Sequence, residues 1–217
     1  EKNMNDTLTI YVISSKRNPE RLDLLKDNFP RSYNNFEIID AVLGDEIYSN
    51  DYFNAIINTY KTFGRLISPN ELGCARSHML AIENFISSKK KYCLILEDDV
   101  IGDDDKLDAV ISELFNIKNG DMLICGTQIN RINNKYLPIK AGVAKKLNKF
   151  ERYFVSGAFS YGLTQEAARK IIYNQKKKFS RSDDWTVVAK NIGMYFVDIL
   201  KHPAGYLESG IEIQRLQ

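Results

Sequence analysis

The sequence predicts an α/β fold in which a mostly parallel sheet is flanked by helices. Short apolar segments typical of strands alternate with longer segments whose apolar residues recur every three or four positions. Two of the strand-like segments, 92–96 and 121–126, are continuously apolar, which indicates strands buried on both faces. Strands that alternate with helices in this way form largely parallel sheets covered by helices.

Length, charge and cysteine content limit the class of protein. The chain has 217 residues, 44% of them hydrophobic, which suits one domain with a sizeable core. Its 30 Lys and Arg nearly balance its 28 Asp and Glu, which argues against a dedicated nucleic-acid-binding protein. No segment approaches the roughly 18 apolar residues of a membrane span, and the polar residues 1–7 do not resemble a signal peptide. Three widely spaced cysteines indicate free thiols and a reducing, cytoplasmic compartment.

Local signals set the expected order of elements. Ser68-Pro69-Asn70-Glu71 is a capping box with proline at the first helical position, so a helix begins there. Asp103-Asp104-Asp105 precedes another helical pattern, where aspartates cap free N–H groups and complement the helix dipole. The expected strands are 8–13, 36–39, 92–96, 121–126, 154–163 and 194–200; the expected helices begin at Asn18, Asp51, Ser68, Lys106, Thr164 and Ser182, and a long loop spans 128–149.

Three adjacent carboxylates, Glu97, Asp98 and Asp99, directly follow the apolar strand at 92–96. Ligands of open α/β sheets bind just beyond the carboxyl ends of the strands. Adjacent acids repel one another unless a cation or protons neutralise them, and their oxygens suit Mg²⁺ or Mn²⁺, which usually also hold phosphate. The pattern predicts a metal–diphosphate site at the edge of the sheet, with a solvated turn or a helix start as the alternative.

Four segments, taken in order, resemble glycosyltransferase family 25, the bacterial lipopolysaccharide and lipooligosaccharide galactosyltransferases. They are Ile10-Tyr11-Val12-Ile13 with Arg17 and Arg21, the helix Glu71-Leu72-Gly73-Cys74-Ala75-Arg76-Ser77-His78, the motif Ile95-Leu96-Glu97-Asp98-Asp99, and Ser156-Gly157-Ala158 with Asp183-Asp184-Trp185. Ser14-Ser15 stands where members of the family commonly have Asn-Leu. The resemblance implies a glycosyltransferase A-type, Rossmann-like fold, an inverting mechanism, a nucleotide-sugar donor (usually UDP-galactose) and a divalent metal.

The resemblance assigns the metal site to Asp99, Glu97 and His202. Glu97 and Asp99 flank Asp98 like the outer acids of an Asp-x-Asp motif, so Asp99 is expected to bind Mn²⁺ or Mg²⁺ directly. Glu97 or Asp98 would then act through water or contact the ribose of the nucleotide. His202 follows the last expected strand, where glycosyltransferases of this fold often supply a ligand from the C-terminal segment.

Asp183 and Asp184 are the expected source of the catalytic base. An inverting transfer displaces the diphosphate from the opposite face of the sugar, so the base lies across the pocket from the metal. One of two adjacent acids points into a pocket, and the other can cap the following helix. Asp183 fits the acidic position of the family better, and Trp185 is either a platform for a sugar ring or a core residue.

The donor is expected to contact Arg17, Arg21, Asp40, Ser77 and His78. Guanidinium groups after the first strand could pair with phosphate or uracil, with surface salt bridges as the alternative. Asp40 ends the second strand, where a carboxylate could hold the base or the ribose. Ser77-His78 matches the family, and the alternative for His78 is a core-edge histidine bonded to a backbone carbonyl.

These inferences predict a single glycosyltransferase domain at 1–217, with a donor and metal half at 1–125 and an acceptor half at 126–217. The expected reaction moves a hexose, in the first place galactose from UDP-galactose, to a lipooligosaccharide or lipopolysaccharide acceptor in the cytoplasm, with peripheral association at the inner membrane. The alternatives are another nucleotide-sugar donor, a nucleotidyltransferase, or a catalytically silent sugar-binding domain. The glycine-rich basic loop usual in nucleotidyltransferases is missing, and the retained acids at 97–99 and 183–184 speak against a silent domain.

Overall fold

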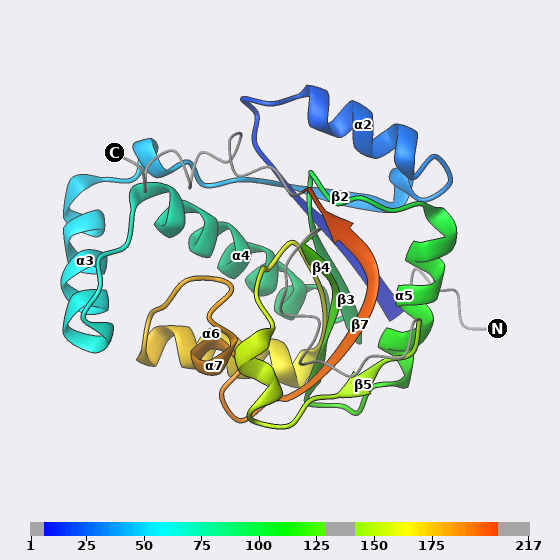
Figure 1. Cartoon of the computed structure of the whole chain (residues 1–217). Helices are drawn as coiled ribbons and strands as arrows, with labels where there is room; N and C mark the ends of the chain where they lie inside the picture. Colours follow the sequence, from blue (N-terminus) through cyan, green and yellow to red (C-terminus); the bar gives the residue numbers. More distant parts are fainter. Residues whose placement is uncertain (1–6, 129–141, 204–217) are drawn as a thin grey trace.

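The computed structural model describes residues 7–128 and 142–203, and their strands form one sheet in the order β2-β1-β3-β6-β4-β7-β5 (Figure 1). β6 runs antiparallel to both β3 and β4, β5 runs antiparallel to β7, and the other pairings are parallel. Five of the strands therefore run in one direction, and the predicted mostly parallel α/β fold is confirmed. The strands are β1 (Leu8–Ser14), β2 (Phe36–Asp40), β3 (Tyr92–Glu97), β4 (Asp121–Gln128), β5 (Lys145–Lys146), β6 (Ser160–Thr164) and β7 (Gly193–His202).

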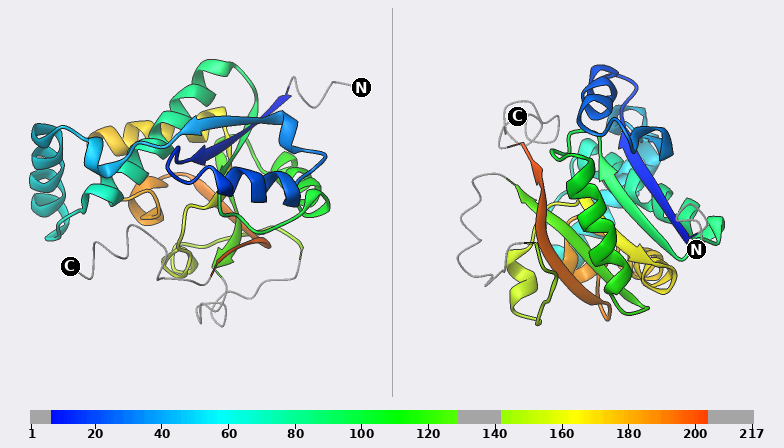
Figure 2. Two further views of the ribbon diagram at one scale, coloured as in Figure 1. Left: turned by 90° about the horizontal axis from the view of Figure 1, so that it is seen from above. Right: turned by 90° about the vertical axis from the view of Figure 1, so that its right-hand side faces the viewer.

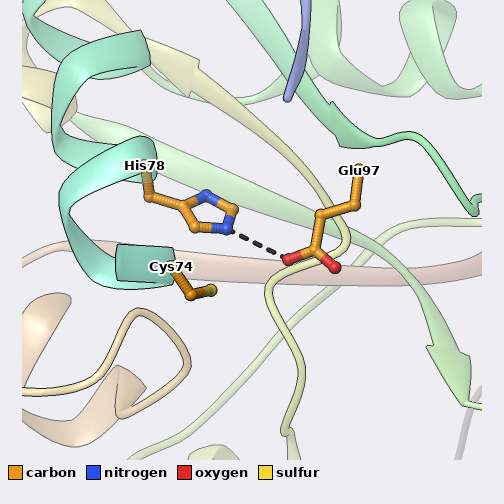
Figure 3. Close-up of side chains that lie close together, drawn as sticks. All are labelled: Cys74, His78 and Glu97. Carbon is orange, nitrogen blue, oxygen red and sulfur yellow. Dashed lines mark hydrogen bonds and ion pairs between the residues drawn. The ribbon is translucent and has the colours of Figure 1, made fainter. Parts of the chain in front are cut away.

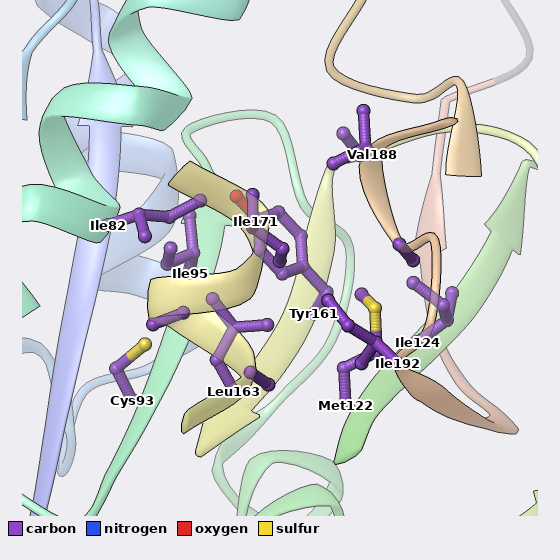
Figure 4. Packing of buried hydrophobic residues seen from close by; sticks show 14 of the residues in the cluster. Ile82, Cys93, Ile95, Met122, Ile124, Tyr161, Leu163, Ile171, Val188 and Ile192 are labelled. Atoms are coloured by element: carbon purple, nitrogen blue, oxygen red, sulfur yellow. The ribbon is translucent and has the colours of Figure 1, made fainter. Parts of the chain in front are cut away.

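Helices cover both faces of the sheet (Figures 1 and 2). Residues of β3 alternate between two hydrophobic clusters, with Cys93 and Ile95 in one and Leu94 and Leu96 in the other. Figure 4 shows the first cluster, which contains residues of α4, α6 and α7; the second contains residues of α2 and α5. This alternation confirms that the strand before the acidic motif is buried on both faces. The helices are α2 (Glu20–Asn28), α3 (Ser49–Phe63), α4 (Pro69–Ser88), α5 (Asp104–Asn116), α6 (Gln165–Lys177) and α7 (Trp185–Val188).

Local capping residues are confirmed at the starts of three predicted helices. Ser68 caps α4, since its hydroxyl accepts a hydrogen bond from the Glu71 N–H at 3.2 Å while the Glu71 carboxylate accepts one from the Ser68 N–H at 2.9 Å. Asp103 caps α5 by accepting from the Lys106 N–H at 2.8 Å, and Thr164 caps α6. Because these caps are made within four residues, the local sequence is sufficient to specify them.

Several predicted boundaries were wrong. β6 begins at Ser160 rather than at Phe154, because residues 151–154 form a 3₁₀ turn and residues 155–159 cross toward the sheet. α2 has Pro19 rather than Asn18 at its N-cap position, with no side-chain cap. The helix expected from Ser182 begins only at Trp185. Of the expected loop at 128–149, residues 129–141 lie outside the described residues, and Lys145–Lys146 pairs with β7 as β5.

The end of β7 bends toward the segment that follows β3. The backbones of Ile101 and Lys201 exchange two hydrogen bonds, of 2.8 and 2.9 Å, in an isolated antiparallel bridge. Gly126 lies where the β4–β7 register shifts, and a Cβ atom there would come 1.8 Å from the Leu200 carbonyl oxygen. Only glycine therefore allows the β7 backbone to come this close to position 126. The bend in β7 brings His202 to the carboxyl end of β3. Within the described ranges, no helix combines the length and apolar character needed to cross a membrane.

Candidate active site

A cleft of about 590 Å³ lies at the carboxyl ends of β1 and β3, between α2, the start of α4 and the end of β7. This is the edge of the sheet where the strand-end acids predicted a site. Most of the predicted donor and metal residues line the cleft: Arg17, Arg21, Ser77, His78, Glu97, Asp98, Asp99 and His202. Asp40, Asp183 and Asp184 are not among the described residues that line it.

Asp98 is held by the protein itself. Its carboxylate is 7% exposed and accepts hydrogen bonds from the Ser14 hydroxyl at 2.8 Å and from Arg21 Nη1 at 3.0 Å. Burial raises the pKa of this carboxyl, against the lowering effect of Ser14 and Arg21. Each Asp98 oxygen accepts one of these hydrogen bonds, so this residue fixes the Arg21 guanidinium at the cleft, and its contact with a ribose stays a prediction.

Asp99 has an oxygen without a partner. Its Oδ2 lies 3.3 Å from Arg21 Nη1 and 3.3 Å from His202 Nε2, whereas its Oδ1 is buried and makes no hydrogen bond. Burial by itself raises the pKa of the Asp99 carboxyl, but the hydrogen bond from His202 and the charges of His202 and Arg21 outweigh it and lower the pKa. The result is a carboxylate that stays ionised with one oxygen free to bind a cation.

Glu97, Asp99 and His202 fit a divalent metal. One ligand atom from each lies within 4.8 Å of the others. His202 Nδ1 lies 3.0 Å from the Pro203 carbonyl oxygen, so Nδ1–H can donate there, and Nε2, which donates to Asp99 when the ring is protonated, would lose its proton to bind a metal. Burial alone would lower the pKa of His202, but Asp99 raises it above the ordinary value. Two carboxylates and one imidazole suit Mn²⁺ or Mg²⁺, and the unpartnered Asp99 Oδ1 is the observation that favours such an ion.

His78 and Ser77 lie on the α4 wall of the cleft. His78 is buried, with Nε2 at 3.1 Å from Glu97 Oε1 and Nδ1 at 2.9 Å from the Tyr161 hydroxyl, so the alternative of a backbone-carbonyl partner was wrong. Ser77 accepts a hydrogen bond from the Val42 N–H at 2.8 Å and donates to the Gly73 carbonyl at 2.8 Å. Ser77 therefore holds the loop after β2 against α4.

Arg17 and Asp40 both form surface ion pairs. Arg17 pairs with Asp45 at 2.9 Å and with Glu46 at 3.4 Å, and it lines the cleft together with Asp45. Asp40 pairs with Lys16 at 2.7 Å on the exposed surface. Arg17 thus forms the surface salt bridges that were the alternative to donor binding. Contact of Arg17 or Asp40 with a donor stays a prediction.

Asp183 and Asp184 lie beside α4 and α7. Asp184 accepts hydrogen bonds from Arg65 at 3.1 Å and from the Thr186 hydroxyl at 3.0 Å, and it makes no side-chain cap to α7. Asp183 is one-third exposed, and its closest ionic partner among the described residues is Arg181 at 3.9 Å. Of the two, Asp183 is the less constrained, and the role of either as base stays a prediction. Trp185 is 2% exposed, packs edge-on against Tyr161 and is a core residue.

Sequence reasoning missed three residues at the site, Ser14, Cys74 and Tyr161. Ser14 was noted only as a departure from the family, yet its hydroxyl binds Asp98. Cys74 lies on the cleft wall with its Sγ 3.3 Å from the Ser182 hydroxyl. A signal for Cys74 was present, because it precedes His78 by four residues on α4 and shares its face. Tyr161 had no such signal, since it reaches His78 from β6.

The mostly parallel α/β sheet, with an acidic cleft at the carboxyl ends of its strands, is a fold of the glycosyltransferase A type. The family model described as glycosyltransferase family 25 (LPS biosynthesis protein) matches residues 7–186. The chain therefore belongs to glycosyltransferase family 25, and the protein is a glycosyltransferase.

The chain is also similar to a curated protein and to two solved structures. A protein of Haemophilus influenzae (strain ATCC 51907 / DSM 11121 / KW20 / Rd), described as "Putative glycosyltransferase", is 23% identical over 93% of this chain and 74% of its own length. The structure of mannose-1-phosphate geranyltransferase from Thermus thermophilus is 12% identical, with a TM-score of 0.50 over 89% of this chain and 74% of that one. Galactosyltransferase LgtC, solved with donor and acceptor sugar analogues, has a TM-score of 0.42 and 10% identity over 91% of this chain and 87% of that one.

Proposed function

We propose that this glycosyltransferase transfers a hexose, in the first place galactose from UDP-galactose, to a lipooligosaccharide or lipopolysaccharide acceptor with inversion at the anomeric carbon. The observation that carries the proposal is the buried, unpartnered Oδ1 of Asp99, beside Glu97 and His202 in a cleft of about 590 Å³. The cleft has room for a nucleotide sugar, and its three adjacent acids favour a cation before a diphosphate approaches them.

The donor side is formed by Asp99, Glu97, His202 and Arg21. The three ligands would hold Mn²⁺ or Mg²⁺, and the ion when bound supplies charge neutralisation for the leaving diphosphate. Arg21 is fixed by Asp98, so its guanidinium is oriented before the donor arrives and can pair with a phosphate oxygen. Arg17 can do the same if it exchanges Asp45 for phosphate.

The acceptor side is assigned to Asp183. The acceptor hydroxyl forms a bond to the anomeric carbon, its proton passes to the carboxylate, and the carbon–oxygen bond to the diphosphate breaks with its electron pair on the departing oxygen. Asp184 is occupied by Arg65 and Thr186, which supports Asp183 as the base and Asp184 as the residue that positions this segment.

The division into a donor half at 1–125 and an acceptor half at 126–217 is part of the proposal, with one modification. His202 belongs to the second half but lies 3.3 Å from Asp99, so the end of β7 would contribute to the metal site. We also infer action at the cytoplasmic side of the inner membrane, with the lipid-linked acceptor in the bilayer and the enzyme bound peripherally.

The test is a thermal-shift and donor-hydrolysis panel with UDP-, GDP- and CMP-sugars, each with Mn²⁺, with Mg²⁺ or with chelator. A ligand that binds only the folded state stabilises it by about 2.7 kcal/mol at 100 times its Kd. We expect the largest rise in melting temperature with UDP-galactose and Mn²⁺, and loss of that rise with chelator. Stabilisation by another nucleotide sugar would identify that compound, and not UDP-galactose, as the donor. A flat response to every nucleotide would contradict the enzymatic proposal and favour a silent sugar-binding domain.

A further inference from the structure

A second group of potential metal ligands lies beside the first. Cys74 and His78 extend from α4 toward the Glu97 carboxylate at the end of β3 (Figure 3). One ligand atom of each residue lies within 4.8 Å of the others, and all three side chains line the cleft. The proposed function uses Glu97 from this group and gives no role to the thiol.

The positions of these residues are fixed by packing around them. Cys74 and His78 are four residues apart on α4, so both side chains lie on one face of the helix. The helix is anchored by the capping box of Ser68 and Glu71, which lies shortly before Cys74 in the chain. His78 is 4% exposed and cannot swing away from Glu97 without leaving Tyr161.

We propose that Cys74, His78 and Glu97 form a binding site for a thiolate-preferring divalent cation, zinc in the first place, which shares Glu97 with the Asp99 site. Thiolate, imidazole and carboxylate are the ligands zinc takes in open, three-residue sites. Tetrahedral ligation at about 2.1 Å by nitrogen and oxygen places those atoms roughly 3.4 Å apart. His78 Nε2 and Glu97 Oε1 are already 3.1 Å apart, so zinc can enter between them with little movement.

Tyr161 supplies the support that such a site requires. A histidine that binds metal through Nε2 must carry its proton on Nδ1, and a hydrogen-bond acceptor at Nδ1 favours that tautomer. The Tyr161 hydroxyl lies 2.9 Å from His78 Nδ1. A phenol oxygen can accept this hydrogen bond, and Tyr161 is held in place by its burial in the core.

Sharing Glu97 couples the two sites. Glu97 lies in both ligand groups, one with the soft sulfur of Cys74 and the other with the hard carboxylate of Asp99. When zinc binds Glu97 beside His78, the Glu97 carboxylate is no longer available, or no longer correctly oriented, to bind an ion held by Asp99 and His202. Zinc is therefore expected to inhibit transfer by weakening the binding of Mn²⁺ or Mg²⁺; this consequence rests on the proposed function, whereas the zinc site itself does not.

The first measurement is Co²⁺ absorption on the whole chain under a phosphine reductant, with Zn²⁺ affinity from competition with a chromophoric chelator. We expect a thiolate-to-cobalt charge-transfer band that Zn²⁺ removes. Cys74→Ser should lose the band and bind Zn²⁺ at least tenfold more weakly, whereas Cys93→Ala, which removes a buried thiol of the core, should keep both. Persistence of the band in Cys74→Ser, or no zinc binding by the natural chain, would overturn the proposal.

A second measurement separates this proposal from the proposed function. Tyr161→Phe keeps the ring but removes the acceptor at Nδ1, and it should weaken Zn²⁺ binding roughly 10- to 100-fold. Asp99→Asn should abolish Mn²⁺ binding, measured by electron paramagnetic resonance, while the cobalt–thiolate band remains. If Mn²⁺ and the donor bind but the band is absent, the zinc site fails alone. If the band is present but no donor binds, the proposed function fails alone.

Discussion

Two neighbouring aspartates at the end of β3 have opposite surroundings. Asp98 uses both carboxylate oxygens within the protein, with Ser14 and Arg21, whereas Asp99 keeps one buried oxygen without a hydrogen bond. A buried acceptor left unpaired costs stability, of the order of 1–3 kcal/mol, unless something binds it. Asp98 therefore orients Arg21, and Asp99 is the residue whose surroundings favour binding of a ligand.

This contrast predicts different outcomes for two conservative substitutions. Asp99→Asn should lower metal-dependent turnover on the order of 100-fold or more, since even residues that only support metal ligands cost about 10- to 100-fold. In the absence of metal it should lose less unfolding free energy than Asp98→Asn, because only Oδ2 of Asp99 has partners, both at 3.3 Å, whereas Oδ1 has none. Asp98→Asn should instead lower the free energy of unfolding by about 1–3 kcal/mol, because the partly buried Arg21 loses the closer of its two ionic partners and keeps only Asp99.

Urea unfolding of the metal-free variants and donor hydrolysis with Mn²⁺ provide the two readouts. Near-normal metal-dependent turnover in Asp99→Asn would contradict the metal assignment. Equal unfolding midpoints for the two variants would contradict the division of roles between the two acids.

The sequence could locate these acids but could not separate their roles. The apolar strand ending in Glu97-Asp98-Asp99 is a local pattern, and it predicted a cluster of acids at the end of a strand, which the structure places in the cleft. Which oxygen is satisfied depends on Ser14 and Arg21, which lie 84 and 77 residues from Asp98 in the chain. Contacts of that separation leave no periodic or spacing signal in a single sequence, and the same holds for Tyr161 beside His78.

At the scale of elements, α4 holds one wall of the cleft through a close backbone approach. A Cβ atom on Gly73 would come 2.4 Å from the Val42 carbonyl oxygen and 3.0 Å from the Gly44 nitrogen. Ser77, one turn later, binds the Val42 N–H. The loop at 41–44 is thereby held against α4, and its residues line the cleft.

Gly73→Ala should therefore act on donor binding as well as on stability. The loop must move to admit the methyl group, since the contact is with backbone and not with a flexible side chain. We expect a loss of about 1–3 kcal/mol of unfolding free energy, typical of an overpacked contact, and a several-fold increase in the KM for the donor. Ser87→Ala, an exposed position near the end of the same helix, is the matched control and should change neither quantity appreciably. An unchanged KM in Gly73→Ala would show that the 41–44 loop does not contact the donor.

Elements were predictable where their signals were local. Capping residues within one turn identified the starts of α4, α5 and α6. The start of β6 was not predictable from its sequence. Residues 154–158 have strand-like composition, but the first backbone hydrogen bond to β3 is made at the Phe159 carbonyl and strand pairing begins at Ser160. β5 has only two residues and exists through pairing with β7, so its own sequence carries no strand pattern.

At the scale of the whole molecule, the site is assembled by long-range topology. β7 pairs with β4 near the far side of the sheet. It bends where it passes Gly126 of β4, and Lys201 then pairs with Ile101. This path brings His202 within 3.3 Å of Asp99, although the two residues lie in opposite halves of the chain. His202 was predicted as a ligand only by resemblance, and the bend is the physical reason that it can serve.

The helix α3 lies at one end of the molecule (Figure 1) and carries exposed apolar side chains. Phe53, Ile57 and Tyr60 recur at helical spacing and are 60%, 47% and 59% exposed, while Ala55 and Thr59 of the same helix are buried. A cationic side chain lies beside its end, where Lys178 Nζ is 4.5 Å from the centre of the Phe63 ring. Apolar side chains next to lysines suit the interface of an anionic bilayer.

We expect α3 to mediate the peripheral membrane association proposed above. The protein should co-sediment with vesicles containing an anionic lipid and much less with purely zwitterionic vesicles, and binding should weaken as salt screens the lysines. The triple variant Phe53→Ser, Ile57→Ser, Tyr60→Ser should lose most of this binding, because each buried apolar group contributes through the area it removes from water.

Tyr153→Ser removes a similarly exposed aromatic ring outside α3 and should bind as the natural protein does. Donor-induced stabilisation, measured on the triple variant, should be retained, since none of its three positions lines the cleft among the described residues. Equal vesicle binding by the triple variant and the Tyr153→Ser control would exclude α3 as the membrane-facing surface and leave the catalytic proposal untouched.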